Sequence, residues 1–354
     1  MKILICVPVI PYPVADGLRA RIFNLTRELA RRHDVHLFCL SRMAPSREQE
    51  QAIAEAGMGL TVALKPFLSP EEKMNAYLKR LVCGVPPELI LPWENPIFQS
   101  LKELHREHRF DVALGEHLFM GRFVLGVQCP HLLDEHNVEG ELFRGLARTE
   151  RAPRRWWKLL AAAWVAGYEK KLLRRMQRVT AVTISDAGKF ETMVPGLPVS
   201  VVKNGVSCSV YKEIATATRE PGDNLLFIGL MGYPATADAV EWFAAEILPL
   251  ICRRRPETVF TVVGKEPPLL AGGGSRLKIL EAFAAAVISP RENGELYQRL
   301  RVNARALVEE KYDWPVLAGK LEVALAETAG IAAGTAGNVR MSSTITGAKV
   351  KRNQ

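Results

Sequence analysis

The chain has 354 residues, of which 48% are hydrophobic and 24% are charged, and its formal net charge is +9 at pH 7. These proportions exclude a disordered or fibrous chain and indicate a globular protein, and the length suggests two domains. The positive charge suits anionic partners such as nucleotide phosphates, nucleic acid or acidic lipid head groups, without choosing among them.

The chain begins with an apolar segment, residues 2–10, that we expect to form a buried strand. The prolines from Pro8 onward break this segment too early for a signal peptide, and no cleavage site follows it. No uninterrupted apolar run reaches about 18 residues, so we expect no transmembrane helix. The six cysteines lie outside metal-ligand spacing, and free thiols in a reducing compartment, the cytoplasm, are the simplest interpretation.

The rest of the first half alternates between helical and strand-like segments. A helix is predicted over residues 19–32, where Ile22, Leu25 and Leu29 share one face. Alternation of this kind indicates a doubly wound α/β domain, which we place at residues 1–205. Its further strands are predicted from apolar runs at 35–40, 60–64, 111–115, 131–134, 179–184 and 199–202.

A second series of strands and helices begins at residue 224. Strands are expected at 224–229 and 258–264, with a weak third at 286–288. Helical patterns follow at 236–253, 292–310 and 314–327.

This second series is too short for a complete nucleotide-binding sheet, because one βαβ unit takes about 30 residues. We therefore predict an α/β protein of two Rossmann-like domains, the second one incomplete and covering residues 206–328. Residues 329–354 are rich in Gly, Ala, Ser and Thr and are expected to form a disordered tail.

The stretch GGGSRLKILEAF, residues 272–283, is suited to bind a phosphate group. Its glycines let a ligand approach free backbone N–H groups at the positive end of a helix, and two cations add charge. Glu281 follows about two turns later, where a carboxylate can accept hydrogen bonds from sugar or ribose hydroxyls. The alternative is a flexible linker before an ordinary amphipathic helix. The candidate donor-binding residues are Gly273, Gly274, Ser275, Arg276, Lys278 and Glu281.

The same stretch resembles the donor-site helix of GT-B glycosyltransferases of the family 4 type, in the subgroup that reads GGG[ST]RLK[IL]LEA. Other segments resemble motifs of this family in the same order, over roughly residues 1–327. They are VPVIPYPVADGLR at 7–19, TISDAGK at 183–189, NGV at 204–206, the opening of the donor domain at 224–243, and NARALVEEKYDW at 303–314.

The resemblance implies a GT-B fold and a retaining transfer of a sugar from a nucleotide-diphosphate sugar to a hydroxyl acceptor. It also implies that no metal and no other cofactor is needed, and the sequence contains no metal-ligand cluster. Cell-surface polysaccharide or glycolipid synthesis, with an acceptor that can be lipid-linked, is the expectation for the family.

Two departures from the family concern the donor domain. One internal block is predicted to be absent after residues 267–270 and another after residues 284–286. Gly273 also occupies the place of the first glutamate in the family's E-x7-E pair, whereas Glu281 fits the second, as in other members of the GGG subgroup. The two absent blocks predict weak or absent donor turnover, whereas the glycine replacement, which the subgroup shares, does not by itself imply inactivity.

Four candidate residues lie on the acceptor side. Gly17 and Arg19 belong to the loop after the first strand, where the alternative is a plain βα turn. His136 follows a strand in the place of the family's histidine, which contacts the transferred sugar, and we expect it to be catalytic together with Glu281. His117 ends the preceding strand, so both histidines are expected at the carboxyl edge of the sheet. A structural or solvated histidine is the alternative for each.

Residues 154–178 predict a basic helix with an apolar stripe that includes Trp157, Leu160 and Leu172. Such a helix can lie on an anionic membrane surface, where a lipid-linked acceptor would be reached. The alternative is a crossover helix whose stripe lies in the core. We expect the protein to be cytoplasmic, either free or, if this helix binds lipid, peripheral at the inner face of the membrane.

Three functions follow from these patterns. The first is a glycosyltransferase, in which Arg276 and Lys278 stabilise the leaving diphosphate. The second is a non-catalytic remnant of that fold which binds a sugar, an acceptor or a partner. The third, a nucleic-acid binder, rests on net charge alone, and since no nucleic-acid module is present we do not expect this partner.

Overall fold

The computed structural model describes residues 1–64, 69–71, 74–75, 94–148, 150–210, 224–229, 232, 234–263 and 294–331. The GGGSRLK stretch, the weak strand at 286–288, the sites of both predicted absent blocks and almost all of the tail lie outside these ranges.

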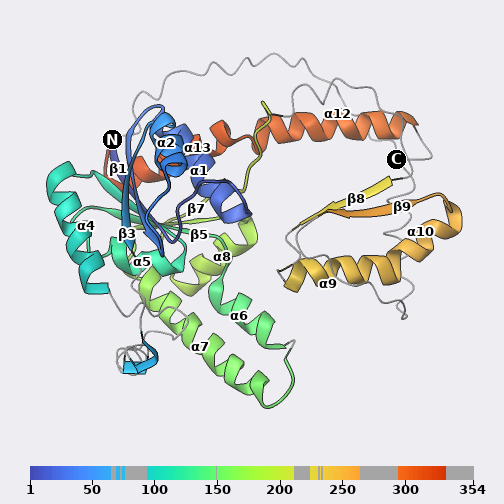
Figure 1. The fold of residues 1–354 in the computed structure, drawn as a ribbon, viewed down its shortest axis with the longest axis horizontal. Coiled ribbons are helices and arrows are strands. Elements are labelled where there is room, and N and C mark those ends of the chain that lie inside the picture. The colour runs from blue at the N-terminus through green and yellow to red at the C-terminus, as the bar shows by residue number, and fades with distance from the viewer. Residues whose placement is uncertain are drawn as a thin grey trace, which may run out of the picture.

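The first domain is built on a seven-stranded sheet in which every neighbouring pair of strands is parallel (Figure 1). The order of the strands is β3-β2-β1-β4-β5-β6-β7. The strands are β1 Lys2–Val7, β2 Asp34–Ser41, β3 Met58–Leu64, β4 Val112–Glu116, β5 His131–Glu135, β6 Arg178–Ala181 and β7 Val199–Val201.

Both faces of this sheet are buried, which explains why its strands are continuous apolar runs. In β1, Leu4 and Cys6 enter one core, whereas Ile3, Ile5 and Val7 enter the other. The first core is completed by α4 (Glu94–His108), α5 (Leu118–Val124), α7 (Arg154–Leu173) and α8 (Ile184–Met193). The second is completed by α1 (Gly17–Ala30), α2 (Arg47–Glu55) and α13 (Trp314–Thr328).

The predicted doubly wound architecture is confirmed, and the differences lie at element ends. β1 stops at Val7, because Pro8 follows and cannot donate a ladder hydrogen bond. The strand predicted at 179–184 ends at Ala181, since Thr183 caps the N-terminus of α8 by accepting a hydrogen bond from the Asp186 N–H. Cys6 and Cys39 are buried free thiols, as predicted.

The described part of the second series contains a parallel pair of strands, β8 (Asn224–Ile228) and β9 (Val259–Val263). Between them the chain forms α9 (Pro234–Trp242), a π-helical segment (Phe243–Ile247) and α10 (Leu248–Arg254). The single helix predicted at 236–253 is therefore interrupted by a π-helical turn.

The C-terminal end of the described chain returns to the first sheet. After α12 (Gly294–Lys311), Trp314, Leu317 and Leu321 of α13 are buried in the second core beside α1. The connection is fixed to residues 203–208, because the Val206 N–H donates to the Tyr312 carbonyl and the Cys208 N–H donates to Asp313. The last helix of the predicted second domain therefore packs on the first.

Helices α6 (Glu139–Arg148) and α7 lie side by side and project from the first domain as a hairpin (Figure 1). They approach closely at Gly140, where an added Cβ would lie 2.5 Å from the Cβ of Ala166. None of the helices among the described residues is long and apolar enough to cross a bilayer.

Candidate functional site

Polar side chains gather where the strand order reverses. The sheet runs from β1 to β3 in one direction and from β4 to β7 in the other, so the switch point lies between β1 and β4. Ligands of open α/β sheets bind at the carboxyl ends of the strands at such a point. Glu116 is the last residue of β4, and Asp134 and His136 stand at the end of β5.

Arg21 and Asp134 form the centre of this site. The Arg21 guanidinium donates through Nε to Asp134 Oδ2 and through Nη2 to Oδ1, at 2.8 Å each. Arg21 also donates to the carbonyls of Val202 and Lys203 at 2.9 Å. The Thr180 hydroxyl donates to Asp134 Oδ1. This set ties α1, β5, β6 and the segment after β7 into one buried unit.

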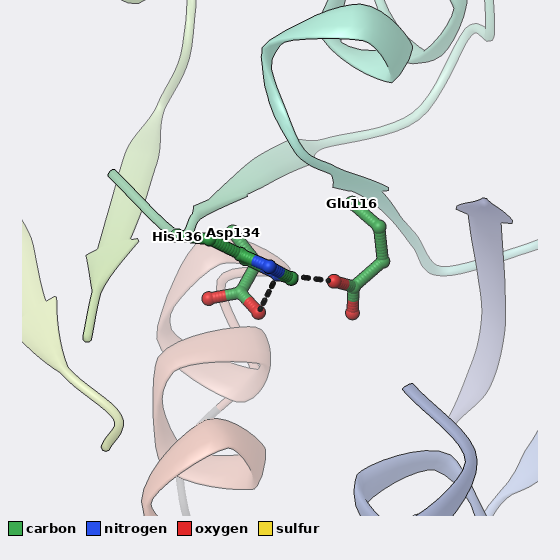
Figure 2. Close-up of side chains that lie close together, drawn as sticks. All are labelled: Glu116, Asp134 and His136. Carbon is green, nitrogen blue, oxygen red and sulfur yellow. Dashed lines mark hydrogen bonds and ion pairs between the residues drawn. The ribbon is translucent and has the colours of Figure 1, made fainter. Parts of the chain in front are cut away.

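His136 is held between two carboxylates (Figure 2). Its Nε2 lies 3.0 Å from Glu116 Oε2 and 3.7 Å from Asp134 Oδ2. We call Arg21, Glu116, Asp134, His136 and Thr180 the Asp134 cluster.

The electrostatics of the cluster favour a charged histidine. Burial alone would lower the pKa of His136, but the hydrogen bonds and charges of Asp134 and Glu116 outweigh it and raise the pKa to about 9. Burial would raise the pKa of Asp134, but the charge of Arg21, with hydrogen bonds from His136 and Arg21, lowers it well below its usual range. Burial and the neighbouring Asp134 raise the pKa of Glu116.

Two atoms of the cluster remain available for hydrogen bonding. His136 has 14% of its side chain exposed, and its Nδ1 makes no hydrogen bond within the described part of the chain. Because the imidazole is protonated at neutral pH, Nδ1–H is a charged donor. Glu116 Oε1 is buried and likewise has no partner among the described residues. The cluster therefore offers a fixed positive donor at the switch point.

The ligand atoms of Glu116, Asp134 and His136 lie within 4.8 Å of one another, a separation that would suit a metal ion. Both oxygens of Asp134 are already engaged by Arg21, however, and a cation would stand beside the guanidinium. A metal would also have to displace a proton from an imidazole whose charged form Asp134 and Glu116 favour. The donor set fits an ion-pair network better than a metal centre.

His117 has a strained backbone beside the cluster. Its φ of 72° and ψ of 154° lie in a region that is essentially restricted to glycine, which costs on the order of 1–3 kcal/mol. The ring stacks on Phe119 and meets His136 edge-on at 5.7 Å between centroids. His117 Nε2 lies 3.1 Å from Glu139 Oε1, and its Nδ1 is buried without a partner among the described residues. Strain of this kind is typical of residues held for function.

A second group of buried carboxyls lies beside the first. Glu169 accepts hydrogen bonds from the N–H groups of Glu139 and Gly140, at 2.8 and 3.1 Å, and so fixes the start of α6. Burial raises the pKa of Glu169 to about 7. Burial also raises the pKa of Glu135 well above its usual range, with Glu169 and Glu139 adding to the effect. Burial among these carboxyls therefore disfavours the charged form of Glu135.

The predicted acceptor-side residues are found in three settings. His136 and His117 are adjacent at the carboxyl edge, as expected. Gly17 begins α1 four residues before Arg21 and faces open space, since an added Cβ would meet nothing within 4 Å. Arg19 pairs with Asp16 and donates to the Ile10 carbonyl at 3.3 Å, so it shapes the loop.

The predicted donor-binding residues, Gly273, Gly274, Ser275, Arg276, Lys278 and Glu281, lie outside the described residues. The sequence prediction in turn missed Arg21, Glu116 and Asp134. A signal for them existed. Arg21 shares a helix face with Leu25, and Glu116 and Asp134 close two apolar strands, so each places a charge where burial is expected.

The known proteins to which the chain is similar agree with this architecture. Sucrose-phosphate synthase from Thermosynechococcus elongatus is 13% identical, with a TM-score of 0.54 over 92% of this chain and 99% of that one. UGT2 of Phytolacca americana, solved with UDP-2fluoro-glucose and pterostilbene, is 11% identical, with a TM-score of 0.51 over 93% of this chain and all of that one. At these identities the likeness shows the fold, an α/β fold of the GT-B type. No curated protein sequence matches the chain.

The sequence itself matches one family model. The model of Glycosyltransferase Family 4 covers residues 15–210, more than half of the chain, and includes every residue of the Asp134 cluster. The chain belongs to Glycosyltransferase Family 4.

Proposed function

We propose that the chain is a retaining glycosyltransferase that moves a hexosyl or related sugar from a nucleotide-diphosphate sugar to a hydroxyl acceptor. The observation that carries this proposal is the position of His136, partly exposed and held by Glu116 and Asp134 at the switch point of a family 4 domain. In the reaction, the bond from the anomeric carbon to the diphosphate oxygen breaks, and a bond to the acceptor oxygen forms. The departing diphosphate takes the acceptor's proton.

His136 contributes by binding and charge. Its Nε2–H is committed to Glu116, so the imidazolium keeps its orientation, and Nδ1–H donates to an oxygen of the donor sugar. A preorganised positive charge at this position stabilises the negative charge that develops on the diphosphate during transfer. His117 and Gly17 border the same edge and are assigned to the acceptor side.

The phosphate contacts are assigned to the GGGSRLK stretch. Arg276 and Lys278 would neutralise the diphosphate, and Glu281 would hold sugar or ribose hydroxyls, as the resemblance implies. The Phytolacca structure holds a UDP-sugar analogue, which makes UDP-sugars the first donors to test. The acceptor is assigned to cell-surface polysaccharide or glycolipid synthesis, at the cytoplasmic side of the membrane.

A calorimetric titration with UDP, GDP and their sugar conjugates tests donor binding. We expect saturable binding of one nucleotide by the wild-type chain and its loss in Arg276→Ala, with Arg253→Ala as a control for an exposed cation on α10. A folded chain that binds none of these nucleotides would contradict the assignment and favour the non-catalytic remnant, whose donor domain has lost its pocket.

A further inference from the structure

The far end of the α6–α7 hairpin exposes large apolar side chains. On the first turns of α7, Trp156 is 65% exposed, Trp157 is 73% exposed and Leu160 is 64% exposed. At 3.6 residues per turn these three side chains fall within an arc of about 100° on one side of the helix. Exposed tryptophans next to each other form an apolar surface that water solvates poorly.

Cations surround this surface. The residues of the hairpin tip, which we define as residues 150–160, include four exposed cationic side chains and a single acid, Glu150, which pairs with Lys158. Two more exposed cations, Arg144 and Arg148, lie along the last turns of α6. The cations of the tip are Arg151, Arg154, Arg155 and Lys158.

The apolar stripe predicted along this helix divides into two parts. Toward the C-terminal end of α7, Leu172 is buried, and Met176 just beyond it is buried as well, so this part belongs to the core. Trp157 and Leu160 at the N-terminal end have no such cover. The core interpretation of the stripe is therefore confirmed at its C-terminal end, and the core packing of α7 leaves the apolar side chains of the hairpin tip uncovered.

We propose that the hairpin tip docks on an anionic membrane surface. Tryptophan rings suit the interface between head groups and acyl chains, because one edge of the ring is apolar and the other can donate a hydrogen bond. The cations beside them are attracted to anionic lipids by about 1 kcal/mol each near the surface. Anionic membrane surfaces bind helices that present an apolar arc flanked by cations, as the start of α7 does.

The charge of the hairpin tip and its two tryptophans together favour a bilayer over two other binding partners. A second copy of this chain would bring an equally cationic tip into contact with the first, and the two would repel each other. An acidic protein would pair with the cations, but it would not account for two neighbouring tryptophans presented together. A bilayer satisfies both kinds of side chain.

The hairpin connects this surface to the Asp134 cluster. Helix α6 begins three residues after His136, where Glu139 lies beside His117. Its ten residues span about 15 Å from that start to the hairpin tip. Docking at the tip would therefore hold the carboxyl edge of the sheet near the membrane. The docking itself uses no residue of the cluster and stands independently of the proposed function.

Vesicle co-sedimentation of the full chain tests the proposal. The vesicles contain phosphatidylcholine alone or phosphatidylcholine with phosphatidylglycerol, at low and high salt. The charge variant is Arg154→Gln with Arg155→Gln, and its control is Arg253→Gln with Arg254→Gln, which removes two exposed cations from the end of α10. The apolar variant is Trp156→Ser with Trp157→Ser, and its control is Met43→Ser, an exposed apolar side chain after β2. Circular dichroism checks that each variant is folded.

We expect binding to the anionic vesicles only, reversed by high salt. The charge variant should lose at least about tenfold in affinity, since two cations are removed, and the tryptophan variant should lose binding by a similar factor. Both controls should bind as the wild type does. Equal binding to neutral vesicles, an equal loss in the controls, or no binding by the folded wild type would overturn the proposal. Self-association that depends on the two tryptophans would also overturn it and assign the surface to a second copy.

Discussion

The guanidinium of Arg21 and the carboxylate of Asp134 form a bidentate ion pair across 113 residues of sequence, with both side chains almost completely buried. The pair fixes α1 to the end of β5. Asp134 lies only two residues before His136 in the sequence. The position of the candidate catalytic histidine therefore depends on an interaction that also holds the fold together.

Replacing Arg21 by methionine should strongly destabilise the first domain. Asp134 would remain buried with only the Thr180 hydroxyl and the His136 imidazole as side-chain partners, and breaking a buried pair in this way costs about 3–5 kcal/mol. Lys189→Met is the control, because Lys189 of α8 pairs with Glu141 of α6 and both side chains are exposed, at 38% and 49%, so its loss should cost about 1 kcal/mol or less. Urea unfolding monitored by circular dichroism measures both. Equal midpoints for the two variants would contradict the role assigned to Arg21.

The stability of the chain should fall as the pH rises from 6.5 to about 9. The pKa of His136 is about 9 in the folded chain and near 6.5 in the unfolded chain, so the folded state binds more protons in this window. The stabilisation is complete below pH 6.5 and is lost as the pH rises through the folded pKa. It amounts to a few kcal/mol at most, at about 1.4 kcal/mol per pKa unit.

Urea midpoints across this pH range test that expectation. His136→Gln should reduce the dependence to the part contributed by the buried carboxyls of Glu135 and Glu169, whereas His131→Gln, at the opposite end of the same strand, should keep the wild-type slope. A slope that persists unchanged in His136→Gln would show that another group is responsible.

The close contact between α6 and α7 should make Gly140 intolerant of substitution. A Cβ at this position would lie 2.5 Å from Ala166 Cβ and 2.9 Å from Ala166 Cα, so the helices must separate, at a cost of about 1–3 kcal/mol. Gly145→Ala on the same helix meets nothing within 4 Å and should stabilise the chain by about 0.5–1 kcal/mol. Thermal unfolding measures both, and two shifts of the same sign would contradict the packing described.

Chelators and added divalent cations should leave the thermal stability of the folded chain unchanged. Arg21 neutralises Asp134 and His136 is protonated, so the cluster is already balanced in charge. Differential scanning fluorimetry with EDTA, Mg²⁺, Mn²⁺ and Zn²⁺ measures this. A rise in the melting temperature with one of these ions, absent in His136→Gln, would assign a metal site to Glu116, Asp134 and His136.

The strands of the first sheet could be predicted because parallel strands buried on both faces are uninterrupted apolar runs. Their ends depend on local chemistry that such runs do not contain. Pro8 shortened the first strand, and the capping hydroxyl of Thr183 started α8 three residues after β6 ended. The return of α13 to the first sheet depends on its contacts with α1, and these two helices are almost 300 residues apart in sequence.

The site could be predicted in part. His117 and His136 follow strand-like runs, and strand order brings the ends of β4 and β5 together. Arg21 and Asp134 each place a charge where burial is expected, but the two lie 113 residues apart in sequence, and only the folded chain shows that they face each other. The backbone strain at His117 has no counterpart in the sequence pattern at all.

Nucleotide release from UDP- and GDP-sugars by the wild-type chain, His136→Gln and His131→Gln, with an acceptor mixture of cell-envelope glycans and glycolipids, tests the proposed transferase activity of the Asp134 cluster. We expect turnover of one donor by the wild type, a loss of about 10²–10³-fold in His136→Gln, as for removal of one preorganised donor, and wild-type rates in His131→Gln. The absence of turnover by the folded wild type, or equal rates in the two variants, would contradict this proposal.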